Sequence, residues 1–264
     1  MYTTTANDTA RDAIIGARLL NGGAAAPAPI STIGAQQNDL LRALSREDLA
    51  QLFPHLEFVK LSVRQRLYEC GGKIDYAYFP TNAIVSLQYV LEDGATTEIA
   101  VVGHDGVAGL AMHAADRASC CAIVQSAGYG YRLKTEHLLA AFSEGGALAR
   151  LLMRYTSAMF AQMAQNVVAS RHSSMEQKLC RWLLDRLDRS VSNELKVTQE
   201  TIAQMLGVRR ESITGAAGKL QDEGMIECGR GRILVTDRAR MERYAGSCYT
   251  AGRAAALQTQ TYHA

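Results

Sequence analysis

The chain has 264 residues and a formal net charge of +2, with 48% hydrophobic and 20% charged residues. This length and composition suit one large domain or two modest domains, each with a real core. No stretch approaches the about 20 consecutive apolar residues of a membrane-spanning helix, and the start lacks the basic segment and apolar run of a secretion signal. We therefore expect a cytoplasmic protein without a membrane partner.

The distribution of charge and the number and spacing of cysteines further limit the functional class of the protein. Residues 171–264 carry 15 Lys and Arg against 11 Asp and Glu, whereas residues 1–170 carry 13 against 15. This basic excess is mild, so attraction to phosphates must come from the placement of individual arginines. The six cysteines form no C-x-x-C pair, which predicts free thiols in a reducing compartment. Cys120 and Cys121 are either a redox sensor or, as we favour, two small apolar residues in a strand.

The first part of the chain is weakly patterned. A tract rich in Gly, Ala and Pro within residues 1–35 predicts a flexible segment without chemistry. Leucines then recur at helical spacing from Asn38, with Ser45 as an internal cap candidate, until Pro54 stops the helix.

Beyond this helix the pattern changes to short alternating segments with Gly-rich breaks. Such a series indicates an antiparallel β-roll or barrel, which we place at residues 36–146 together with its flanking helices. Glu92-Asp93-Gly94 is the hairpin turn between the two longest segments. The expected strands are 58–63, 76–80, 83–91, 96–102, 121–125 and 130–133.

A helix restarts near Thr135 and is followed by the longest periodic run, residues 147–170, which contains neither Pro nor Gly. At about 1.5 Å per residue this run spans roughly 35 Å, which is long for one small core. We therefore predict that part of its apolar stripe meets a second copy, with Gln162 or Asn166 fixing the register of the seam. The alternative is packing wholly within one chain.

The stretch from Thr198 to Leu220 predicts two short helices joined by a tight turn. Thr198 is a good N-cap, and Gly207 lies where the first helix must stop and the chain must reverse. An amphipathic helix over 171–190 precedes this pair, and its Trp182 is expected to anchor the core between the two parts of the chain. Segments 225–228 and 233–235 can pair as a hairpin, and a short helix follows at 237–244.

The exposed start of the second short helix offers guanidiniums, a carboxylate and hydroxyls, which can contact base edges in a major groove. The arginines at the tip of the hairpin can meet phosphates. A helix pair with such a hairpin forms a winged helix-turn-helix, placed at 171–245 before a tail at 246–264; the alternative is a small helical domain with a solvated basic turn. The candidate DNA contacts are Thr198, Gln199, Arg209, Arg210, Glu211, Ser212, Thr214, Lys219, Arg230 and Arg232.

The order of β-roll, long helix and winged helix-turn-helix resembles the Crp/Fnr family of bacterial transcription regulators, over roughly residues 38–244. The most specific motif is Gly207-Val208-x-Arg210-Glu211-Ser212-Ile213. The resemblance implies an α+β fold with a cyclic-nucleotide-binding-like roll and a homodimer that binds a palindromic DNA site, with RNA polymerase as a further partner. It also implies that Arg210 and Glu211 read bases. A third reader that the family often has is absent, because Gly215 stands at that position.

The resemblance also concerns the effector. Cyclic-nucleotide-binding members carry a Gly-Glu pair for the ribose and an Arg-Ser or Arg-Thr pair for the phosphate. Here residues 103–109 lack the Glu, and the phosphate Arg aligns with Cys121 or a neighbour, with Arg117 off register. We therefore expect no tight cyclic AMP binding. With no Cys before Cys70, the family's N-terminal iron–sulfur cluster is also disfavoured.

Other functional classes have weaker support. The histidines form no H-x-H or H-E-x-x-H pair, and no nucleophile stands at motif spacing from a base, so we expect neither an enzyme nor a metal site or cofactor. His104 and His113 are each treated as turn or surface residues rather than haem or metal ligands. The remaining alternatives are a haem, redox or metabolite sensor whose roll gates DNA binding, an enzyme on the roll with an accessory winged domain, and a winged helix that binds protein. The effector and the direction of regulation stay open.

Overall fold

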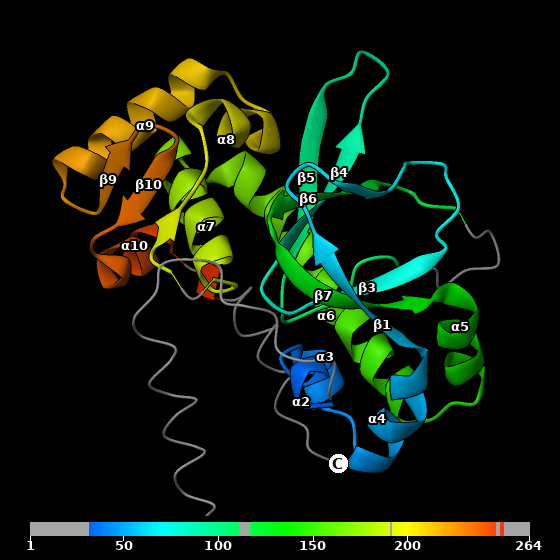
Figure 1. The fold of residues 1–264 in the computed structure, drawn as a ribbon. Coiled ribbons are helices and arrows are strands. Elements are labelled where there is room, and N and C mark those ends of the chain that lie inside the picture. The colour runs from blue at the N-terminus through cyan, green and yellow to red at the C-terminus, as the bar shows by residue number, and fades with distance from the viewer. Residues whose placement is uncertain (1–31, 111–116, 191, 247–248, 251–264) are drawn as a thin grey trace, which may run out of the picture.

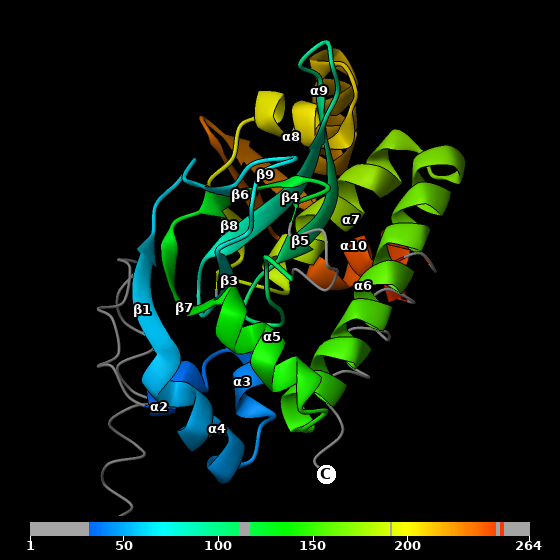
Figure 2. The ribbon, with the colours of Figure 1, turned by 90° about the vertical axis from the view of Figure 1, so that its right-hand side faces the viewer.

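The computed structural model describes residues 32–110, 117–190, 192–246 and 249–250. A β-roll makes up most of the N-terminal half, and a helical domain with a small sheet lies beside it (Figure 1). A long helix runs along one side of the roll before the chain enters the second domain (Figure 2). The expected α+β class and order of parts are therefore confirmed.

The roll consists of two antiparallel sheets whose inner faces form the core. One has the order β1-β7-β3 and the other β2-β6-β4-β5, so β5 is an edge strand. The strands match the predicted alternating segments, except that β2 was not predicted. They are β1 (Leu56–Leu61), β2 (Arg66–Tyr68), β3 (Tyr76–Pro80), β4 (Ile84–Val90), β5 (Thr96–Val102), β6 (Cys121–Ser126) and β7 (Gly128–Lys134).

The β4–β5 hairpin turns where it was predicted. Tyr89 faces Thr97 in the ladder, and Val90 faces Thr96. Gly94 adopts a φ of 82°, a left-handed conformation that favours glycine. The hairpin extends well beyond the rest of the roll (Figure 1).

Short helices close one end of the roll. Two predictions need correction here. Residues 32–35, expected to be flexible, form a helical turn, α2 (Thr32–Ala35), with Ala35 buried. The single helix expected between Asn38 and Pro54 is two helices, because the hydroxyl of Ser45 accepts a hydrogen bond from the Asp48 amide at 3.0 Å and starts a new one. They are α3 (Asp39–Arg42) and α4 (Arg46–Leu52), followed by the 3-10 turn η1 (Phe53–His55).

The long helix α6 (Ala147–His172) follows α5 (Thr135–Ser143) and packs one face against the roll. Its buried side chains include Leu148, Leu151, Leu152 and Tyr155. Met153, Phe160, Val167 and Val168 on the other side are at least half exposed. Of the two residues predicted to fix the register of a dimer seam, Asn166 bonds within its own chain, because its amide donates to the Ile99 carbonyl of β5 at 2.9 Å, which leaves Gln162 as the candidate.

The amphipathic helix predicted over residues 171–190 begins four residues later, at Met175, because α6 continues to His172. The chain leaves α6 at His172, and Ser174 starts α7 with a capping box to Gln177. Trp182 is buried in the core of this domain. The elements are α7 (Met175–Leu187), α8 (Gln199–Leu206), α9 (Arg210–Asp222), α10 (Arg238–Ala245) and a sheet of β8 (Glu194–Leu195), β10 (Arg232–Val235) and β9 (Ile226–Gly229).

Part of the predicted tail belongs to this domain. Tyr249 is 2% exposed and donates its hydroxyl proton to the Asp188 carboxylate at 2.9 Å. Residues 251–264 of the tail, and residues 1–31 of the leading segment, lie outside the described residues. Within the described ranges, every helix is too short or too polar to cross a bilayer.

Candidate nucleic-acid interface

The turn between α8 and α9 follows from local sequence. The Thr198 hydroxyl accepts a hydrogen bond from the Thr201 amide at 3.1 Å and caps α8. Gly207 ends α8 with a φ of 64°, and its amide donates to carbonyls of the last turn. A residue with a Cβ would be strained there, so the glycine makes the sharp change of direction possible.

One face of α9 is fixed in the domain core. Ile213, Ala216, Ala217 and Leu220 are all 3% exposed or less and pack against α7 and α8. This burial, at positions that repeat every three or four residues, leaves the other face of α9 in solvent. The helix is therefore held rigidly while its polar side stays accessible.

The accessible side carries the predicted base-reading group. Arg209 is the N-cap residue of α9 and makes no side-chain cap, so the amides of the first turn are not satisfied by a side chain at the cap position. Arg210, Glu211, Ser212 and Thr214 follow, and all are exposed. Guanidiniums next to a positive helix end suit a polyanion, and the carboxylate and hydroxyls add directional contacts.

Two other candidates, Gln199 and Lys219, bond to residues of the neighbouring helices. The Thr214 hydroxyl donates to the Gln199 side-chain oxygen at 2.8 Å and connects α9 to the start of α8. Lys219 lies in the last turn of α9, where its ammonium is 2.6 Å from the Glu176 carboxylate of α7. Hydrogen bonding to Lys219 lowers the pKa of Glu176 to about 2. Lys219 therefore links α9 to α7 and stands apart from the base-reading group.

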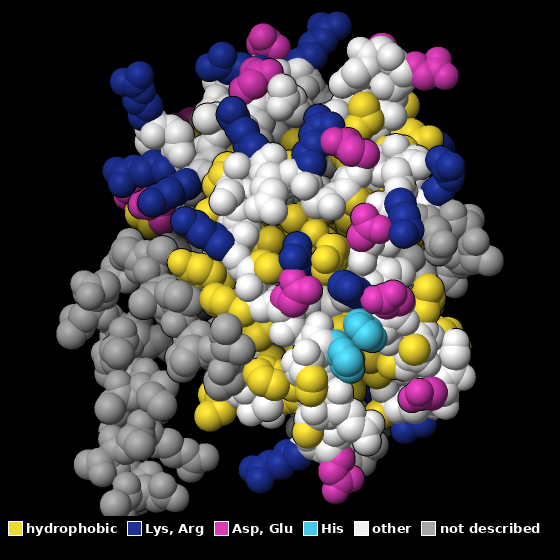
Figure 3. Space-filling model, turned by 45° about the vertical axis from the view of Figure 1, so that its right-hand side comes forward, with side chains coloured by type: hydrophobic (Ala, Val, Ile, Leu, Met, Phe, Trp, Pro, Cys, Tyr) yellow, Lys and Arg dark blue, Asp and Glu magenta, His cyan; other side chains and the backbone are white. Residues whose placement is uncertain are grey.

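The hairpin of β9 and β10 is the predicted wing. Its turn is Arg230-Gly231, and Gly231 has a φ of 71°. Arg230 is exposed at the tip, whereas Arg232 starts β10 and lies 3.5 Å from the Glu194 carboxylate of β8. Figure 3 shows Lys and Arg side chains concentrated on the upper half of the molecule, which includes the C-terminal domain.

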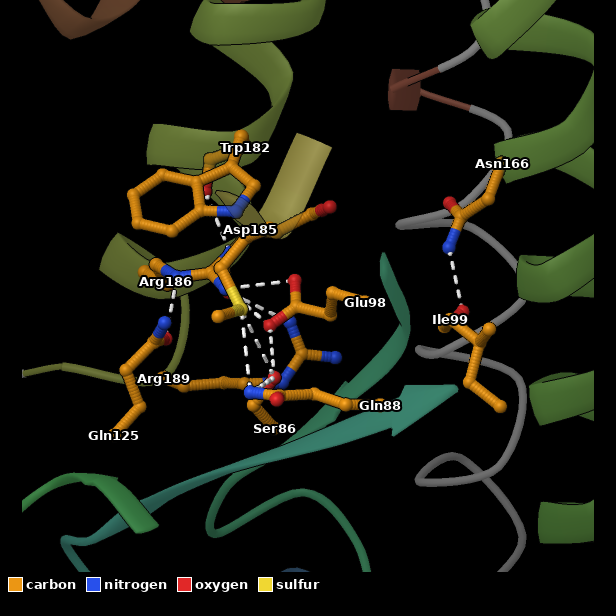
Figure 4. Close-up of polar contacts among 11 residues, drawn as sticks. Ser86, Gln88, Glu98, Ile99, Gln125, Asn166, Trp182, Asp185, Arg186 and Arg189 are labelled. Atoms are coloured by element: carbon orange, nitrogen blue, oxygen red, sulfur yellow. Dashed lines mark hydrogen bonds and ion pairs between the residues drawn. The ribbon is translucent and has the colours of Figure 1, made fainter. Parts of the chain in front are cut away.

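The opposite side of the helix pair docks on the roll, which the sequence did not reveal. The Met205 sulfur of α8 lies 3.2 Å from the Gln88 amide nitrogen and 3.6 Å from the Ser86 hydroxyl, both on β4. Arg186 of α7 is bonded to the Glu98 carboxylate of β5 at 2.6 Å and stacks over Trp182 (Figure 4). Trp182 therefore belongs to the C-terminal core and only reaches the interface between the two parts through Arg186.

The roll shows no obvious chemical centre among the described residues. His104 lies 3.1 Å from the buried Asp39 carboxylate, and this hydrogen bond raises the pKa of His104. Burial raises the pKa of Cys120 to about 11, so its thiol is protonated and poorly reactive at neutral pH. In the described ranges no group of three His, Cys, Asp or Glu side chains is arranged to hold a metal ion. His113 lies outside the described residues.

Comparison with known proteins agrees with this arrangement. Residues 177–244 match the family model of the Crp-like helix-turn-helix domain. FixK2 from Bradyrhizobium japonicum is similar in structure, with a TM-score of 0.62 and 18% identity over 73% of this chain and 98% of FixK2. The chain has the Crp/Fnr fold. No curated protein matches it by sequence.

Two further solved structures share the Crp/Fnr fold. A protein of Eubacterium rectale assigned to the Crp/Fnr family of transcriptional regulators has a TM-score of 0.63 and 17% identity, over 79% of this chain and 98% of its own. The c-di-GMP responsive global regulator CLP of Xanthomonas campestris has a TM-score of 0.60 and 15% identity, over 73% of this chain and 100% of CLP. The Crp/Fnr fold thus covers both the roll and the DNA-binding-type domain.

Proposed function

We propose that this protein is a sequence-specific DNA-binding transcription regulator that acts as a homodimer in the cytoplasm. The observation that carries the proposal is the exposed first turn of α9. There Arg209, Arg210, Glu211 and Ser212 stand together at a helix start on a Crp-like helix-turn-helix domain. Such a turn inserts into a major groove with its side chains toward base edges.

The candidate contacts divide into two groups by position. Arg210 and Glu211 read bases, because an Arg bonds guanine in the major groove and a carboxylate accepts from cytosine. Arg209, Ser212 and Thr214 line the same surface. Thr198, Gln199, Lys219, Arg230 and Arg232 flank it and contact phosphates, which gives affinity without sequence preference.

The homodimer is supported by the exposed stripe of α6. Met153, Phe160 and Val167 are seven residues apart, and the small residues Ser157 and Ala164 lie between them at spacings of four and three. This is the heptad pattern with which two helices pack in a coiled coil. Each apolar member is at least 58% exposed in one chain, so a second copy covers a surface that is otherwise unfavourable.

Dimer symmetry then determines the form of the DNA site. Two α9 helices related by a two-fold axis meet half-sites about one helical turn apart, so the operator is a palindrome. In this arrangement residues 36–146 form a sensor-like roll, 147–170 the dimerisation helix and 171–245 the DNA-binding domain. RNA polymerase is the partner through which a bound regulator affects transcription.

Control by cyclic AMP is not part of the proposal. The loop that the family resemblance matches to ribose binding packs directly on α6, so closely that a Cβ at Gly106 would collide with the Tyr155 hydroxyl. The phosphate arginine of the family is matched by Cys121 or a neighbour, and Cys121 is 1% exposed. Neither segment offers a guanidinium to a cyclic phosphate.

Selection of bound fragments from a random DNA pool tests the function. The expected result is one palindromic motif whose binding weakens steeply with salt, because phosphate contacts release counterions. The Arg210→Ala protein should lose preference at one base pair per half-site, whereas Arg230→Ala should weaken all sequences alike. Recovery of no motif, or of a single half-site bound by a monomer, would contradict the proposal.

A further inference from the structure

The edge strand β5 is covered by the C-terminal part of the chain rather than by another strand. Strand β4 pairs with one of its edges, and in the described residues no strand pairs with the other. The Asn166 amide of α6 bonds the Ile99 carbonyl from that side. A Cβ built on Gly207 would lie 3.2 Å from the Thr97 hydroxyl, so the turn of the helix-turn-helix lies against the start of β5.

Two buried ion pairs connect α7 and the residues after it to β5 and the loop that follows it. The Arg186 guanidinium lies 2.6 Å from the Glu98 carboxylate, and the two side chains are 3% and 9% exposed. The Arg189 guanidinium lies 2.8 Å from the Asp105 carboxylate, and these side chains are 7% and 17% exposed. Figure 4 shows Glu98 and Arg186 pointing toward each other across the junction.

Close backbone approach accompanies the second pair. A Cβ built on Gly103 would lie 2.7 Å from the Cβ of Arg189. The Asp105 carboxylate also accepts a hydrogen bond from the Gly103 amide at 3.1 Å, which fixes its position in the loop. The glycine therefore lets the loop and the Arg189 stem touch, and the carboxylate is already oriented when it meets the guanidinium.

This interface orients the C-terminal domain without covering its reading surface. Arg209, Arg210, Glu211 and Ser212 are exposed while both ion pairs are closed. Planar guanidiniums hold carboxylates in defined directions, so two pairs at separate points fix both position and rotation. Buried ion pairs contribute little net stability, and one of their attested uses is to specify a particular arrangement.

We propose that the Arg186–Glu98 and Arg189–Asp105 pairs form an interdomain latch that sets the spacing between the two DNA half-sites. The latch fixes the position of α9 relative to α6, and α6 defines the dimer axis. The two α9 helices of the dimer are therefore held at one fixed distance and angle. This inference rests on the proposed homodimeric DNA binding. It assigns a specificity role to residues that are far from the DNA surface.

Half-site spacing is a sensitive measure of this geometry. Each base pair inserted between half-sites shifts one of them by about 3.4 Å along the axis, and rotates it by about 35° in a duplex of roughly 10.5 base pairs per turn. A latched dimer meets only one such arrangement. A dimer with the latch open can tilt its C-terminal domains and accept several.

The experiment measures binding of the full chain to its selected palindrome with zero, one or two base pairs added to or removed from the centre. The test variants are Glu98→Gln and Asp105→Asn, which keep shape and one acceptor oxygen but remove the charge. The matched control is Glu57→Gln, because Glu57 pairs with Arg132 at 2.6 Å between strands of the roll, away from the C-terminal domain. Circular dichroism melting identifies any variant that is unfolded, and affinity for an isolated half-site is measured in parallel.

Wild type and Glu57→Gln should prefer one spacing strongly. Each test variant should reduce that preference by about tenfold, or about 1.4 kcal/mol, with half-site affinity unchanged. An unchanged spacing profile in both test variants would overturn the latch, and so would tighter binding at the original spacing, which would indicate an inhibitory contact. Failure of the wild type to bind any palindrome would refute the proposed function itself, a result distinct from either.

Discussion

Two faces of the C-terminal domain use arginine in opposite ways. On the docking face, Arg186 and Arg189 are almost fully buried, and each has a carboxylate partner from the roll. On the proposed reading face, the exposed first turn of α9, Arg209 and Arg210 are exposed, and among the described residues neither has an ion-pair partner. The domain thus separates arginines that fix its position from arginines that remain available to a polyanion.

The difference has a physical basis. A buried guanidinium must be neutralised, because an unpaired charge in a low-dielectric interior is strongly unfavourable. An exposed guanidinium is hydrated and exchanges water or counterions for phosphate and base contacts. Mutating the first kind should therefore change folding, whereas mutating the second should change only binding.

The largest expected effect tests the docking face. Arg186→Ala leaves the Glu98 carboxylate buried without its partner and removes the stacking over Trp182. Loss of one member of a buried pair costs about 3–5 kcal/mol. Urea unfolding should show this loss, while Arg210→Ala should change the free energy of unfolding by no more than about 0.5 kcal/mol. Equal losses in the two variants would remove the distinction between the faces.

The next effect concerns a third surface, the exposed apolar stripe of α6. Phe160 is 74% exposed, so Phe160→Glu should leave the fold of one chain unchanged. In the proposed dimer it removes an aromatic contact worth about 1.5–3 kcal/mol, which corresponds to roughly ten- to a hundredfold weaker self-association. Analytical ultracentrifugation measures this. Leu139→Glu is the control, because Leu139 is a partly exposed apolar residue of α5, and a matching loss there would argue against a specific seam.

A smaller effect isolates the reading face. Arg210→Ala should weaken binding to the selected site by about 1–3 kcal/mol and relax its sequence preference at one position. Arg243→Ala removes an exposed arginine from α10 in the same domain and serves as the charge-matched control. Fluorescence anisotropy with the selected site and with single-base variants provides the measurement. If both variants lose affinity equally for every sequence, Arg210 contributes only general electrostatic attraction.

The two faces also differ in how far they could be predicted from sequence. The reading face follows local rules: Thr198 caps a helix, Gly207 supplies a left-handed turn, and the apolar positions of α9 repeat at helical spacing. Each signal lies within a few residues of the structure it specifies. The same holds for the strand pattern and for the turn at Gly94.

The docking face depends on partners far away in the chain. Arg186 and Glu98 are 88 residues apart, and Arg189 and Asp105 are 84 apart. Arginines on an amphipathic helix usually lie on its solvent-exposed face, so no signal in the neighbouring sequence indicated that these two are buried. A small signal was present, because Gly103 precedes Asp105 in a loop, and such a glycine permits close backbone approach. The three-residue strand β2 was missed for a different reason, since it is too short to show alternation.

The smallest expected effect tests whether a glycine in α9 lowers the stability of the domain and in return lets the helix backbone approach DNA. Gly218 lies in the interior of α9 with nothing within 4 Å of a built Cβ, so Gly218→Ala should raise the free energy of unfolding by about 1 kcal/mol. Gly207→Ala is the matched opposite, because a φ of 64° makes alanine strained and the substitution destabilising. Urea titration of both variants shows whether each raises or lowers the free energy of unfolding, and DNA binding by Gly218→Ala shows whether the glycine affects affinity.

A more stable protein that binds its site less well would mean that the bare backbone of α9 contacts DNA, since no neighbour within the chain requires a glycine there. A more stable protein with unchanged affinity would restrict the reading face to the first turn of α9.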